Sequence, residues 1–246
     1  MEFAEDKCQV LTITRKLKRN IITKDYEIHN YKLDRVDSAK YLGLYLDSKL
    51  TFNHHINSIC KKAHNTRQFL QRTLSRCDTK TKAQACTTFV RPIVEYGATV
   101  WDPHNAYNDS QVKRVESVQS KAARFACSDW RHTSSVSDMK ARLDWESLQE
   151  RRARSRVMMM HKIYYSQVAI PLLHFPLNTA LNAQTRGITA KFVVPTPRTE
   201  SHRRTFMIAA PFMWNGLQAS QILVSDPEAF RGQLSKVQLS KVRLTV

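Results

Sequence analysis

The most constraining feature of this sequence is a change in the spacing of its apolar residues near residue 54. Beyond that point, apolar side chains recur at steps of three and four residues, which is the period of one face of an α-helix. Lysine and arginine occupy other positions of the same segment. The pattern therefore predicts an amphipathic, basic helix whose apolar face is formed by Ile56, Ile59, Cys60, Ala63, Leu70 and Leu74.

Capping signals predict further helices downstream. Asp78 is placed to cap a second helix that runs through Phe89 and is kinked or broken at Pro92, because proline removes a backbone donor. Asp109 or Ser110 is placed to cap a third helix.

Two capping-box signatures, each a serine followed three residues later by an acidic residue, predict a fourth and a fifth helix. The first is Ser135 with Asp138, and the second is Ser147 with Glu150. The helix that opens at the second signature carries several arginines in its first turns.

Strands are predicted ahead of these helices. Residues 8–14 and 41–46 are rich in β-branched or apolar residues, and residues 26–33 are a candidate for a third strand between them. A meander this small is not stable by itself, so we expect helices from downstream to cover its apolar face.

After Tyr165 the chain is punctuated by prolines, and only residues 188–194 have a β-like pattern. We therefore expect irregular, extended structure there, followed by a last helix that opens at Pro227 and runs toward Val237. Together the patterns predict an α+β fold that is predominantly α-helical, with short strands near the N-terminus and a looser C-terminal region.

The net charge points to a polyanionic partner. Lysine and arginine number 39 against 21 acidic residues in 246, giving a formal charge of +18. The excess is +2 over residues 1–50, +9 over 51–160 and +7 over 161–246. Such an excess of positive charge usually serves binding to nucleic acid or to an acidic membrane, and we predict nucleic acid.

The longest apolar runs are too short for a membrane span, and the acidic start of the chain is unlike a signal peptide. We therefore expect an intracellular protein that makes no contact with membranes.

Two segments carry a family resemblance. Arg91–His104 reads RPIVEYGATVWDPH, and Val115–Phe125 reads VESVQSKAARF. They resemble the region beyond the palm in non-LTR (LINE-type, jockey-like) retrotransposon reverse transcriptases. The resemblance extends over about residues 1–237. Its most specific parts are residues 40–56, 89–104, 112–125 and 205–217.

The resemblance implies three regions. Residues 1–50 would be a remnant of the palm end and primer grip, and residues 51–165 would be a helical thumb-like region. Residues 166–246 would be a C-terminal region with extended segments and a last short helix. Trp214-Asn215 matches the closing Trp-Asn of the family, whereas Gly216 and Gln218 depart from the serine and proline that follow there.

The metal-binding carboxylate motifs of the family have no counterpart in the chain. A reverse transcriptase holds two metal ions, expected to be Mg²⁺, with carboxylates from two motifs, and this chain has no adjacent Asp-Asp. Phe3-Ala4-Glu5-Asp6 stands out of register with the catalytic box, and Met1–Leu11 aligns better with a later Phe-Asn-Pro-Asp-Lys-Cys motif. On that alignment Lys7 is a weak catalytic candidate near the departing pyrophosphate, and the alternative is a solvated lysine before a strand.

No cofactor or metal site is predicted in the chain itself. The cysteines lack a Cys-x-x-Cys pair, and the histidines lack the paired spacing of a zinc site. We therefore assign no metal. Because the carboxylate motifs are missing, we also expect no polymerase activity from the chain alone. The five cysteines are Cys8, Cys60, Cys77, Cys86 and Cys127.

The segment Lys40–Asp47, of sequence KYLGLYLD, resembles the primer grip of these enzymes. Lys40 and Gly43 are its candidate nucleic-acid contacts, because glycine permits close approach of the backbone. For the structure of this segment we favour the alternative, a core strand that contains a bulge, and keep primer contact as the role that the resemblance implies.

The basic helices resemble the thumb that packs over the template–primer duplex. Cations on a helix face neutralise phosphates, although a merely solvated surface is the alternative. The candidate contacts are Lys61, Lys62, Arg67, Arg72, Arg114, Lys121, Arg124, Arg151, Arg152, Arg154 and Arg156. The tryptophans Trp101, Trp130, Trp145 and Trp214 are read as core anchors rather than base-stacking platforms.

The resulting prediction is a fragment of an RNA-directed DNA polymerase that contributes template–primer binding and not catalysis. Its partners would be RNA and DNA, together with an upstream polymerase part of the same element, and it would be nuclear if functional. The alternatives are a domesticated basic nucleic-acid-binding module and, with less support, a membrane-surface protein.

Overall fold

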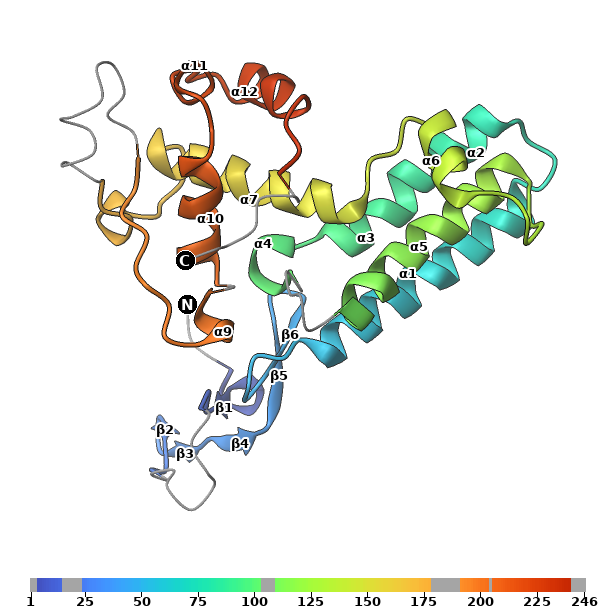
Figure 1. The fold of residues 1–246 in the computed structure, drawn as a ribbon. Helices are drawn as coiled ribbons and strands as arrows, with labels where there is room; N and C mark the ends of the chain where they lie inside the picture. Colours follow the sequence, from blue (N-terminus) through green and yellow to red (C-terminus); the bar gives the residue numbers. More distant parts are fainter. Residues whose placement is uncertain (1–3, 15–23, 103–108, 178–190, 204, 240–246) are drawn as a thin grey trace. The chain divides into compact units, whose positions relative to one another are not determined.

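The computed structural model describes residues 4–14, 24–102, 109–177, 191–203 and 205–239 (Figure 1). The chain forms two compact units, Met1–Lys62 and Ala63–Val246. Short strands belong to the first unit and most helices to the second. This is the mainly helical α+β fold that the sequence predicts.

The strands of the first unit pair two by two. The turn Glu5–Lys7 precedes β1 (Gln9–Leu11), which pairs in parallel with β4 (Asp34–Val36). The other two pairs are antiparallel, namely β2 (Glu27–Ile28) with β3 (Tyr31–Lys32) and β5 (Ser38–Tyr41) with β6 (Leu44–Asp47). The strand expected over residues 8–14 is present only at residues 9–11, and the strand expected over 26–33 is instead a hairpin of two strands with two residues each.

The run 41–46, expected as one strand, is instead divided between β5 and β6 by a tight hairpin turn. Tyr41 pairs with Leu44, and the two turn residues Leu42 and Gly43 have φ values of 45° and 84°. Positive φ at both central positions is typical of the two-residue turn that suits the twist of paired strands. The turn was not predicted because Leu42 is apolar and so extends the apolar run, although its side chain is 72% exposed.

The helical part begins with α1 (Asn53–Thr73), which starts in the first unit and ends in the second. Its apolar face is buried at Ile56, Cys60, Ala63 and Leu70, as the spacing predicts. The helices that follow α1 are α2 (Thr79–Ala85), α3 (Arg91–Glu95), α4 (Ala98–Trp101), α5 (Asp109–Cys127), α6 (Val136–Arg142) and α7 (Leu148–Tyr164).

Three of the predicted caps are confirmed by hydrogen bonds. The side chain of Asp78 accepts from the Thr81 amide at 3.3 Å, and Ser135 and Ser147 accept from the amides three residues beyond them at 3.2 and 3.1 Å. The side chain of Asp109 lies outside the described residues, so the cap at Asp109 or Ser110 stays a prediction.

The break expected at Pro92 takes the form of a π-helical turn just before it. Residues Cys86–Val90 form this turn, and the Arg91 amide donates to the Cys86 carbonyl five residues back. Pro92 then lies in the first turn of α3, where its missing donor costs nothing. Gly97, with φ of 62°, separates α3 from α4.

The C-terminal segment is more helical than expected. It contains α9 (Glu200–Arg203), α10 (Phe206–Asn215), α11 (Ala219–Ile222) and α12 (Pro227–Leu234). The expectation of irregular structure is wrong for α10. This helix is buried around most of its surface, so its sequence is apolar almost throughout and shows no helical period. α12 begins at Pro227, as predicted, where the Asp226 side chain accepts from the Ala229 amide, but it ends at Leu234.

Only part of the β-like run at 188–194 falls within the described residues. There Phe192 forms an isolated antiparallel bridge with Leu177. Residues 188–190 lie outside the description.

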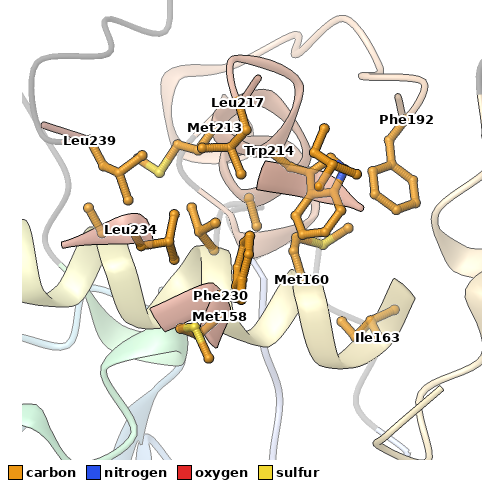
Figure 2. Packing of buried hydrophobic residues seen from close by; sticks show 14 of the residues in the cluster. Met158, Met160, Ile163, Phe192, Met213, Trp214, Leu217, Phe230, Leu234 and Leu239 are labelled. Atoms are coloured by element: carbon orange, nitrogen blue, oxygen red, sulfur yellow. The ribbon is translucent and has the colours of Figure 1, made fainter. Parts of the chain in front are cut away.

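A hydrophobic core joins α7 to the C-terminal helices (Figure 2). Met160 and Ile163 of α7 pack with Trp214 of α10 and Phe230 of α12, and all four are fully buried. The carboxylate of Glu150 at the start of α7 also accepts from the Leu239 amide at 2.7 Å. Residues on both sides of position 165 therefore contribute to one core.

Candidate nucleic-acid interface

Two of the predicted phosphate-binding arginines lie instead around a buried carboxylate. Arg152 Nε donates to Asp102 Oδ1 at 2.9 Å, and Arg156 Nη2 donates to Asp102 Oδ2 at 2.7 Å. The three side chains are at most 4% exposed. Arg152 also lies over the ring of Trp101, with 5.9 Å between Cζ and the ring centroid. These contacts hold the end of α4 against α7.

This cluster carries two guanidinium groups against one carboxylate. Burial lowers the pKa of Arg156, and the neighbouring charge of Arg152 lowers it further, while Asp102 opposes both effects. Because both guanidinium groups are closed off from solvent, they stabilise the helix pairing and cannot reach a phosphate.

The other two arginines of this helix are also paired within the chain. Arg151 makes a two-point ion pair with Glu95 of α3, and this hydrogen bonding raises the pKa of Arg151 despite its partial burial. Arg154 pairs with Glu146, with 2.8 Å between Nη2 and Oε1. Both arginines also line a groove along α7, whose lining includes Met158 of the same helix.

Arg67 and Arg124 have structural contacts as well. Arg67 is 6% exposed, donates to Gln71 at 2.6 Å and lies 5.9 Å from the ring centroid of Trp130. Arg124 donates to the Arg131 carbonyl at 2.8 Å, which fixes the loop between α5 and α6.

Five of the predicted cations are exposed on α1 and α5. They are Lys61, Lys62 and Arg72 on α1, and Arg114 and Lys121 on α5. Within the described part of the chain, Lys61, Arg72 and Lys121 have no hydrogen-bond or ion-pair partner.

The two helices are electrostatically coupled near His64. Burial lowers the pKa of His64, and the nearby charges of Lys121 and Arg67 lower it further. His64 is therefore held neutral beside these cations, and it adds no positive charge of its own at neutral pH.

The primer-grip-like segment is the exposed β5–β6 hairpin of the first unit. Lys40 and Gly43 are both exposed, and Lys40 Nζ lies 5.6 Å from the ring centroid of its cross-strand neighbour Tyr45. Asp47 ends the hairpin. Burial acts to raise the pKa of its carboxyl, but hydrogen bonds from Thr51, Lys49 and Phe52 together outweigh burial and lower the pKa. The structure thus shows an exposed turn here rather than a bulged core strand. Lys7 is exposed at the end of the turn before β1.

Three of the four tryptophans are buried as expected, and Trp130 differs. Trp101, Trp145 and Trp214 are at most 9% exposed, whereas Trp130 is 47% exposed beside Arg67. The prediction of a core role is therefore wrong for Trp130, which lies in the loop between α5 and α6.

Sequence reasoning missed two cations that line the same groove as Arg151 and Arg154. They are Lys162 at the end of α7 and Arg231 on α12. The available signal for Lys162 was its spacing from Arg151, since eleven residues correspond to three helical turns. No sequence pattern connects Arg231 to them, because α12 reaches α7 only through the tertiary fold.

No group of three or more His, Cys, Asp or Glu side chains that could hold a metal ion occurs within the described ranges. Among the helices that the structure describes, none combines the length and apolarity that crossing a bilayer demands.

Comparison with curated proteins finds two relatives in Drosophila melanogaster. The chain is 31% identical over 106 residues to a probable RNA-directed DNA polymerase from transposon BS, and 26% identical over 133 residues to a probable RNA-directed DNA polymerase from transposon X-element. The chain is thus similar to part of each of these two transposon polymerases.

The matched segments make up only a small part of the two curated polymerases. The matches cover 42% and 52% of the chain but only 11% and 14% of the two polymerases. No protein-family model matches the chain. No solved structure matches it either.

Proposed function

We propose that the chain binds template–primer nucleic acid as the thumb-like part of a non-LTR retrotransposon reverse transcriptase and does not catalyse polymerisation by itself. The observation that carries this proposal is the set of exposed cations on α1 and α5, on a chain with a net charge of +18. The relatives support the polymerase context.

The spacing of the cations on α1 suits a phosphate backbone. Lys61 and Arg72 are eleven residues apart, so they lie on one helix face about 16 Å from each other. The residues at intermediate steps on this face, Asn65 and Gln68, are polar. Such a face neutralises phosphates and releases their counterions, and the binding it produces is salt-sensitive and largely independent of base sequence.

Catalysis would come from a polymerase part that this chain accompanies. That part would supply the carboxylates and Mg²⁺ for two-metal chemistry, and RNA and DNA would be the shared partners. We further infer a nuclear location, where the DNA target of such an element lies.

The proposal is tested by binding of the full chain to an RNA–DNA hybrid at several salt concentrations. The triple variant Lys61→Gln, Arg72→Gln and Lys121→Gln should flatten the slope of log K against log salt by about 2 to 3, since each phosphate contact contributes roughly 0.9. The control Arg142→Gln removes an exposed cation of α6 and should leave the slope unchanged. A triple variant that binds with the wild-type slope would contradict the proposal.

A further inference from the structure

A groove with a volume of about 630 Å³ lies along one face of α7 in the second unit. One wall is α7 itself, and the other walls are the turn from α3 into α4 and part of α12. The volume is in the range of sites that hold a ligand rather than isolated waters.

Positive charge dominates the lining of the groove. Arg151, Arg154, Lys162 and Arg231 line it, against the single carboxylate of Glu95. Glu95 is paired with Arg151, and the partners of the other two arginines, Glu146 and Glu228, are not lining residues.

Lys162 is the cation in the groove with the greatest freedom to meet a ligand. Its ammonium group has no hydrogen-bond or ion-pair partner within the described ranges, whereas the guanidinium groups of the three arginines are each paired with one carboxylate. An ammonium group has three donors, and a phosphate oxygen is a matching acceptor.

The cations of α7 are arranged as a row. Arg151, Arg154, Met158 and Lys162 follow each other at steps of three, four and four residues, which keeps them on one helix face over about 16 Å. Phosphates of one strand follow each other every 3.4 Å or so along a duplex axis, so this length spans several of them.

The remaining lining favours phosphates over bases. It contains hydroxyl groups at Thr99 and Ser155 and the methionines Met158 and Met159, and no lining residue that the structure describes is aromatic. Without aromatic rings the groove lacks the surfaces on which bases stack. Recognition here would therefore depend on charge and hydrogen bonding to the backbone.

We propose that this groove holds the sugar–phosphate backbone of one nucleic-acid strand, as a contact separate from the cations of α1 and α5. This inference deepens the proposed function and rests on it. The contact would add to affinity without adding base specificity.

The decisive variant is Lys162→Gln with Arg231→Gln, which leaves the ion pairs of Arg151 and Arg154 in place. Arg231 is 58% exposed, and among the described residues its ion-pair partner is the exposed Glu228 three residues away, so its loss should not disturb folding. In the full chain this double variant should lower the salt slope of RNA–DNA hybrid binding by about 1 to 2. The matched control is Lys80→Gln with Arg142→Gln, which removes two exposed cations from α2 and α6 and should have no effect.

A photo-crosslinking group at Met159 reports occupancy of the groove directly. Crosslinking of the hybrid at position 159, weakened at least fivefold by the double variant, is the expected result. Binding that depends on the α1 and α5 cations, with no crosslink at 159 and a wild-type slope for the double variant, would overturn the groove contact alone. Absence of any nucleic-acid binding would overturn the proposed function as well. Displacement of the crosslink by poly-glutamate as readily as by nucleic acid would identify an acidic peptide as the occupant instead.

Discussion

Asp102 shows how one side chain decides the role of its neighbours. Its two oxygens each accept from a different arginine of α7, at 2.9 and 2.7 Å, in a setting where all three groups are shielded from water. Removing one partner of a buried ion pair leaves an uncompensated charge, which is the costly case for such clusters.

We therefore expect Asp102→Ala to lower the free energy of unfolding by about 3 to 5 kcal/mol, measured by urea denaturation. The control Glu228→Ala removes one partner of an exposed carboxylate–arginine pair and should cost less than about 1 kcal/mol. If the two variants lost equal stability, the buried cluster would not have the structural role assigned to it.

His161 gives the stability of the C-terminal core a pH dependence. Its ring is fully buried, stacks on Phe230 with 4.3 Å between centroids, and lies 2.8 Å from the Val224 carbonyl through Nε2. Burial lowers the pKa of His161 below its usual value near 6.5, and the hydrogen bond to Val224 only partly offsets this. The unfolded chain therefore takes up a proton at a higher pH than the folded chain.

By linkage, the free energy of unfolding should fall as the pH drops from 7.5 through 6.5 toward 5.5. The variant His161→Gln removes the titrating group and should show a shallower pH dependence, by up to about 1.4 kcal/mol per pH unit. The measurement is the urea midpoint at each pH, and identical pH profiles for the two proteins would refute the assignment. His55 and His64, whose pKa values burial also lowers, remain in both proteins and supply a common background.

At the scale of elements, the β5–β6 hairpin depends on the backbone of its turn. Gly43 has φ of 84°, a conformation that side chains rarely adopt, whereas Gly232 in α12 has only open space around an added Cβ. Gly43→Ala should therefore speed hydrogen exchange of the hairpin amides by about fivefold or more, as expected for a loss of roughly 1 kcal/mol.

Gly232→Ala is the matched control, because alanine is the better helix former in a helix interior. It should stabilise the chain by up to about 1 kcal/mol and leave exchange in the hairpin unchanged. A hairpin that tolerates alanine at 43 as well as glycine would contradict the turn described here.

The elements differ in how well the sequence predicts them. The caps of α2, α6 and α7 were predictable because a cap is a local hydrogen bond between residues three apart. α10 was not predictable in this way, since a helix buried around most of its surface has no polar face to reveal its period.

At the scale of the whole molecule, the sequence predicted the sign of the charge but not which cations face solvent. Asp102 and Arg152 are fifty residues apart, so only the tertiary fold shows that they pair. By contrast, the exposure of Lys61 and Arg72 followed from their place opposite the apolar face of α1. The exposure of these two cations was thus predictable from one helix, whereas the burial of Arg67 on the same helix and the pairing of Asp102 with Arg152 were not predicted.

The central claim is that the chain holds nucleic acid through its phosphates, and it is tested most directly by the salt dependence of binding. The full chain should bind two RNA–DNA hybrids of unrelated sequence with equal affinity, and log K should fall linearly with log salt with a slope of about −3 or steeper. Binding that is insensitive to salt, or no binding at 50 mM salt, would contradict the account.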